Sequence, residues 1–140
     1  MEQYADKYRS VIRALQCDTD FCVIAAEYSY SHFGNYLIEI KYMNAVVIEI
    51  INDRSITEIA ILISGLLSTE RIPLAFAAEQ LLLEKDRVPQ YAYDDSHDMY
   101  DCLVQNKSIF DMLKDKRRQR TILRKWCRKS INFWTKRNSR

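Results

Sequence analysis

A chain of 140 residues with 48% apolar and 29% charged residues is long enough to bury a core, but its uninterrupted apolar runs, such as Phe21–Ala26 and Ile59–Ile63, are too short to cross a bilayer. Its net charge of +2 hides an uneven distribution, because residues 1–113 carry 9 Lys/Arg against 18 Asp/Glu, whereas residues 114–140 carry 12 against one. Either the basic tail folds back on the acidic body, or the two regions meet partners of opposite charge.

The first ten residues, MEQYADKYRS, contain no apolar segment of the kind that marks a protein for export. We therefore expect a cytoplasmic protein without a membrane partner. The chain also contains only two glycines, too few for the glycine-rich loops that hold phosphates in nucleotide-binding proteins.

The first expected element is a helix over residues 2–16, where apolar residues recur at helical spacing with charged residues opposite them. Four runs rich in β-branched and aromatic residues then predict strands, and they cover residues 21–30, 36–42, 45–51 and 56–63. The polar breaks between the runs are too short for parallel crossovers. We therefore expect a four-stranded antiparallel meander with one apolar face covered by helices. In the second strand this face is expected to carry Tyr36, Ile38, Ile40 and Tyr42.

Three helices are expected after the sheet. Pro73 suits the first turn of one helix, and Ser96 suits the N-cap of a second helix that extends to Leu113. The third is a basic helix over residues 117–137. With no internal repeat or linker, residues 1–140 are expected to form a single α+β domain with an N-terminal helix, a central sheet and C-terminal helices packed on it.

The sequence offers little for catalysis. His32 and His97 are the only side chains that titrate near neutral pH without a shifted pKa, and both fall where solvated histidines are common. No hydrolase, phosphate-binding or dinucleotide-binding motif is present, and the cysteines and histidines match no zinc pattern. We expect no catalytic residues, no metal and no cofactor.

An acidic and aromatic segment spans residues 91–101. Four carboxylates and three tyrosines in this short stretch have the composition of a surface that meets a basic protein, because the charge speeds association and the aromatic rings supply contact area. The same acids also suit the cap of a helix beside a solvated loop. The candidate partner-binding residues are Tyr91, Tyr93, Asp94, Asp95, Asp98, Tyr100 and Asp101.

The basic helix offers three interpretations. Its cations, interleaved with aromatic residues, suit the phosphates of nucleic acid or an anionic membrane surface. Because Trp126 and Trp134 fall on the apolar stripe of the helix, the third interpretation is a helix that packs on the core and leaves its cations in water. The candidate nucleic-acid-binding residues are Arg124, Lys125, Arg128 and Lys129.

Two short segments carry a resemblance. Phe33-Gly34-Asn35-Tyr36-Leu37 opens one predicted strand, and Asn52-Asp53-Arg54-Ser55 closes the next, with Ser55 where a glycine is usual. This pattern resembles a hairpin signature of small bacterial immunity proteins from contact-dependent growth inhibition and other polymorphic toxin systems. The resemblance implies a non-enzymatic cytoplasmic protein that binds and neutralises a cognate toxin domain. The alternative is a nucleic-acid-binding or regulatory module that acts through the basic helix.

Overall fold

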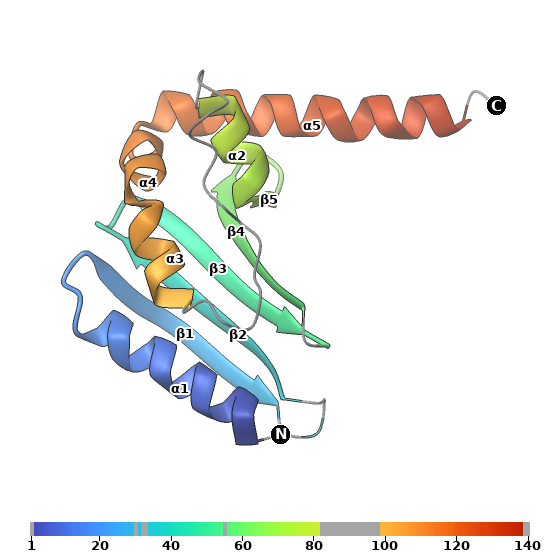
Figure 1. Ribbon diagram of the computed structural model, residues 1–140. Helices are drawn as coiled ribbons and strands as arrows, with labels where there is room; N and C mark the ends of the chain where they lie inside the picture. The colour runs from blue at the N-terminus through green and yellow to red at the C-terminus, as the bar shows by residue number, and fades with distance from the viewer. Residues whose placement is uncertain (1, 30, 32–33, 55, 82–98, 139–140) are drawn as a thin grey trace.

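The computed structural model describes residues 2–29, 31, 34–54, 56–81 and 99–138. A single antiparallel sheet lies behind a layer of helices, and one long helix crosses the end of the sheet (Figure 1). The expected α+β class, with an N-terminal helix, an antiparallel meander and C-terminal helices, is confirmed.

The sheet has five strands in the order of the sequence, so each strand pairs with the one before it. The strands are β1 (Phe21–Ser29), β2 (Asn35–Tyr42), β3 (Val46–Asp53), β4 (Ile56–Ser64) and β5 (Thr69–Pro73). The expectation of four strands was wrong, because β5 has too little apolar alternation to be recognised in the sequence. It forms because the turn after Ser64 brings it back along β4, and Pro73 is accommodated at its end, on the edge of the sheet.

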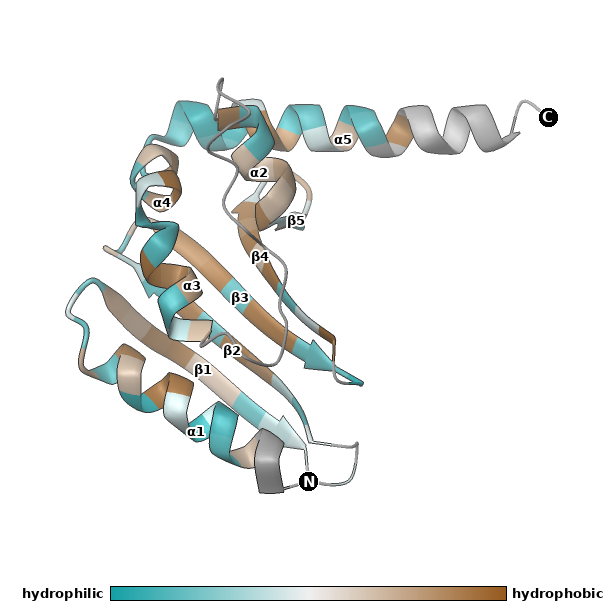
Figure 2. Ribbon diagram, viewed as in Figure 1, coloured by the Kyte–Doolittle hydropathy of each residue, from teal (hydrophilic) through white to brown (hydrophobic). Residues whose placement is uncertain are grey.

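The face of the sheet that points toward the helices is almost entirely apolar. Cross-strand register places Tyr36, Ile38, Ile40 and Tyr42 on it, as expected. The same rows continue through β3 and β4 with Val46, Ile48, Ile50, Ile59 and Ile61, all buried. Figure 2 shows this hydrophobic character along β3 and β4 and the more hydrophilic character of α5 (Lys116–Asn138).

Helix α1 (Glu2–Gln16) packs on β1 at one side of this face, and its Tyr8 ring lies 5.3 Å from Tyr28 and 5.5 Å from Tyr36. Helix α2 (Leu74–Leu81) follows β5 directly and contacts β4 and β5. Helix α2 thus begins one residue after the expected start.

The second expected helix is two helices, α3 (Met99–Gln105) and α4 (Lys107–Leu113), separated at Asn106. The Asn106 side chain is buried, and its Nδ2 donates to the carbonyl oxygen of Cys102 at 2.7 Å. The Asn106 carbonyl accepts the amides of Ile109 and Phe110. These bonds satisfy backbone groups around the break, so the chain bends without leaving them unpaired.

A polar cluster ties α3 and α4 to the start of β1. Lys107 Nζ lies 3.1 Å from Asp18 Oδ2 and 3.0 Å from Asp20 Oδ2, and the Tyr100 hydroxyl donates to Asp18 at 2.8 Å. The hydrogen bond to Asp20 is the largest contribution that raises the pKa of Lys107, to about 12, and Asp18 contributes as well. Burial alone would raise the pKa of Asp18, but hydrogen bonds from the Asp20 amide, Tyr100 and Lys107 outweigh it and lower that pKa.

Helix α5 crosses the end of the sheet and continues past it (Figure 1). Its bounds agree with the expected basic helix within one residue. Gln119 is buried and donates to the carbonyl oxygens of Ala45 and Leu113, which ties the start of α5 to the β2–β3 turn and to α4. Trp126 packs edge-on against Phe76 of α2 at 5.0 Å and is half-buried.

Candidate functional site

Several described residues of the two segments that carry the resemblance lie close together at one end of β2 and β3, whereas Phe33 and Ser55 lie outside the described residues. Asn35 lies opposite Asp53, and its side chain donates to Asp53 Oδ1 at 3.1 Å while it accepts the Arg54 amide at 2.9 Å. Gly34 has a positive φ of 72°, and Arg54 has a φ of 51°, so both turns contain a residue in the left-handed conformation. The motif therefore has a structural role in fixing two neighbouring turns of the sheet.

Most of the acidic and aromatic segment, including Tyr91, Tyr93, Asp94, Asp95 and Asp98, lies outside the described residues. The other two candidates differ from each other. Tyr100 is half-buried and bonded to Asp18, so it supports the packing of α3. Asp101 is exposed in the first turn of α3.

The second face of the sheet, which we call the open face, has no counterpart to the helical layer among the described residues. Its residues follow from the register of the strands. One row runs Glu27, Leu37, Ile51 and Glu58; the next runs Ala25, Glu39, Glu49 and Ala60; a third runs Cys22, Lys41, Val47 and Leu62. The large apolar residues of these rows are half-buried, and four glutamates stand among them.

Glu49 sits at the centre of the open face and is 5% exposed, although no helix covers it. Arg71 of β5 is paired with Leu62 of β4, and its Nε lies 2.6 Å from Oε1 of Glu49, which is paired with Ala60 two residues away on the same strand. This contact is an ion pair, and the buried Oε1 has no hydrogen-bond partner among the described residues. Glu39 lies directly opposite Glu49 on β2, and two like charges in that position destabilise a sheet.

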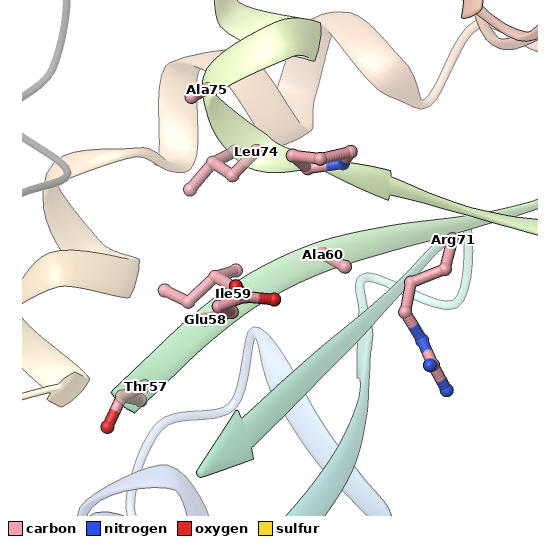
Figure 3. Close-up of a pocket in the computed structure, with 8 residues that line it drawn as sticks. Thr57, Glu58, Ile59, Ala60, Arg71, Leu74 and Ala75 are labelled. Atoms are coloured by element: carbon pink, nitrogen blue, oxygen red, sulfur yellow. The ribbon is translucent and has the colours of Figure 1, made fainter. Parts of the chain in front are cut away.

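A cavity of about 290 Å3 adjoins the open face where β5 gives way to α2 (Figure 3). Thr57, Glu58 and Ile59 line it from β4, and Leu74 and Ala75 line it from α2. Arg71 also borders it, but its guanidinium is directed away from Leu74 and Ala75. The cavity is large enough for one side chain of a partner, and it extends the open face to the edge of the sheet.

The four candidate cations of the basic helix have different surroundings. Arg124 and Arg128 line a groove between α5 and the β4–β5 turn. Lys129 Nζ instead lies 5.2 Å from the ring centre of Phe76 and 6.0 Å from that of Trp126, so it contributes to the packing of α5 on α2. Lys125 is exposed but is not among the groove residues.

The sequence reasoning missed three features of these surfaces. It did not identify Glu49 as a buried carboxylate on the open face, nor the two further groove arginines, Arg117 and Arg120. It also gave no role to Leu66 and Leu67 in the β4–β5 turn. The pairing of two apolar residues in so short a turn was the available signal, since turns are usually polar.

Comparison with protein-family models, with curated proteins and with solved structures finds no match. Within the described ranges, no group of three or more His, Cys, Asp or Glu residues is arranged to hold a metal ion. None of the helices in these ranges has the length and apolar character needed to cross a membrane.

Proposed function

We propose that this protein is a non-enzymatic cytoplasmic immunity protein that binds and neutralises a cognate toxin domain through the open face of its sheet. The observation that carries this proposal is the chemistry of that face. Half-buried Leu37, Val47, Ile51 and Leu62 share this face with the four glutamates of two rows, and no described helix covers them.

Such a face suits a protein partner better than a small molecule. Small-molecule sites are concave and enclose most of the ligand, whereas this surface spreads over several strands, and the cavity described at its edge has a volume of about 290 Å3. Protein interfaces combine apolar contact area with charges that steer association.

The charges favour a basic partner. Glu27, Glu39 and Glu58 have no ionic partner described within 4 Å, whereas Glu49 is paired with Arg71. An arginine or lysine from a partner that sits beside Glu39 and Glu49 would relieve the repulsion between these two carboxylates.

The direct test is co-expression with the product of the reading frame that precedes this gene, because an immunity gene is expected to follow the gene of its toxin. We expect the two products to co-purify and this protein to restore growth. Replacing Glu39 and Glu58 by Lys should slow association by about tenfold or more, because both changes reverse the charge of the binding face.

A matched control reverses two exposed carboxylates on the helical side, Asp6 and Glu79, and should bind as the wild type does. A third variant, Asp94→Lys with Asp95→Lys, tests the acidic and aromatic segment. If that variant alone loses binding, the interface lies on the segment and not on the open face. If no variant and no wild-type protein binds the neighbouring product, the immunity function itself is wrong.

A further inference from the structure

The β4–β5 turn places two leucines in solvent beside the basic helix. Leu66 is 105% exposed and Leu67 is 100% exposed, so neither side chain has protein cover. Burying a leucine is strongly favourable, and a turn between two short strands normally uses small or polar residues. Contact with an apolar environment would therefore stabilise these two side chains, and the described part of the chain does not provide one.

The turn is held in place. The Gly65 amide donates to the Ser68 carbonyl at 2.8 Å, and the hydroxyls of Ser64 and Thr69 lie 3.1 Å apart across the base of the turn. Gly65 is packed so closely on α5 that a Cβ there would lie 3.2 Å from Leu123 Cδ2. The leucines are thus presented at a fixed position relative to α5.

Four arginines share the side of α5 that faces this turn. Arg117, Arg120, Arg124 and Arg128 are spaced by three or four residues, which places them on one face of a helix, and all four are exposed. Together with the turn they line a groove of about 1110 Å3. Glu70 is the acidic residue among the described lining residues, and Ile131, which is 63% exposed, continues the apolar part of the groove along α5.

We propose that the β4–β5 turn and the arginine face of α5 form a docking surface for an anionic phospholipid membrane. Leu66 and Leu67 enter the boundary of the acyl chains, and the arginines bind the lipid phosphates. This proposal departs from the expectation of a protein without a membrane partner. The contact is interfacial, and the lack of a spanning helix in the described ranges concerns crossing the bilayer, not lying against it. The surface is separate from the open face and does not depend on the proposed immunity function.

A membrane explains both the arginines and the exposed leucines of this surface, whereas nucleic acid explains only the arginines. Phosphates of either ligand would satisfy the arginines. Nucleic-acid grooves that grip single strands add aromatic rings on which bases stack, but no described residue of this groove is aromatic. Two protruding aliphatic side chains fit the apolar edge of a bilayer.

The test uses the full-length protein and sedimentation with two kinds of vesicle, pure phosphatidylcholine and phosphatidylcholine with about one third phosphatidylglycerol. We expect binding to the anionic vesicles at low salt, weaker binding at high salt, and much weaker binding to the neutral vesicles. Replacing both Leu66 and Leu67 by Ser should lower the partition coefficient by about tenfold or more. Replacing Arg120 and Arg124 by Gln should lower it by roughly fivefold for each arginine.

Matched controls separate specific contacts from general effects. Arg9→Gln with Arg13→Gln removes the same charge from α1, and Ile56→Ser removes an exposed aliphatic side chain at another turn. Both should bind as the wild type does, and circular dichroism should show that every variant is folded. Failure of the wild type to bind anionic vesicles at low salt would overturn the proposal. A second result would also overturn the proposal: the wild type binds an oligonucleotide in preference to vesicles, and the leucine variant binds it equally well. That result would assign the arginines to nucleic acid.

Discussion

The two faces of the sheet are built from the same strands, so adjacent residues of one strand lie in different environments. On the covered face, Ile48 and Ile50 are fully buried against the helical layer. On the open face, Val47 and Ile51 are only half-buried and share their surface with glutamates. The comparison indicates that stability resides mainly on one face, which leaves the other free to carry charge and to change without loss of the fold.

The largest expected effect contrasts two neighbouring isoleucines of β3. Ile50→Ala should lower the free energy of unfolding by about 2 to 5 kcal/mol, because it creates a cavity in the core. Ile51→Ala removes the same atoms from the half-buried open face and should cost about 1 kcal/mol. Urea denaturation of both variants measures the difference, and equal losses would mean that both faces belong to the core.

A second comparison concerns the ionic contacts on the helical side. Lys107→Met leaves Asp18 and Asp20 without their cation at the start of β1, and we expect a loss of about 2 kcal/mol. Lys114→Met is the control, because the ion pair of Lys114 is a local one with Asp111, at 3.4 Å, and its other contact is a weak one with Met43 Sδ. A loss for Lys107→Met no larger than for this control would show that the cluster does not hold α3 and α4 to β1.

The ion pair between Arg71 and Glu49 on the open face should contribute less to stability than the Lys107 cluster does. Arg71→Gln leaves Glu49 buried without its cation, and we expect a loss of about 1 kcal/mol because Arg71 itself is more than half exposed. Adding Glu49→Gln to this variant removes the unpaired charge and should recover part of the loss. Thermal or chemical denaturation of the single and double variants checks this, and a double variant less stable than Arg71→Gln would contradict it.

The smallest expected effect is a change in the pH dependence of the free energy of unfolding. The pKa of Asp18 is lowered in the folded protein, so its contribution to stability is present above the ordinary value of 3.8 and is lost as the pH falls below it. The pKa of Lys107 is raised from 10.5 to about 12, so its contribution is lost as the pH rises through that interval. Asp18→Asn should therefore flatten the acid side of the stability curve. It should weaken the alkaline side only in part, because Lys107 keeps its contact with Asp20, the largest cause of its raised pKa. Denaturation from about pH 5 to about pH 3 measures the acid side, and an unchanged slope there would exclude Asp18 as its source.

The sequence by itself determined the fold class, the first four strands, α1 and the extent of α5, because these elements have strong periodicity or clear breaks. It also identified the apolar face of β2 from alternation alone. Other features depended on contacts between distant segments. β5 forms only against β4, Asn106 divides a helix because its environment is buried, and Lys129 turns to the rings of Phe76 and Trp126.

The candidate surfaces show the same division. The sequence located the charges but not their neighbours. Glu49 and Arg71 are 22 positions apart and meet because β3 and β5 both pair with β4, in a register that brings the two side chains to the same part of the open face. The arginines of α5 become one wall of a groove because α5 packs on Gly65 and brings Leu66 and Leu67 beside them. Periodicity shows which face of an element a residue occupies, but only the packing of the elements decides what that face meets.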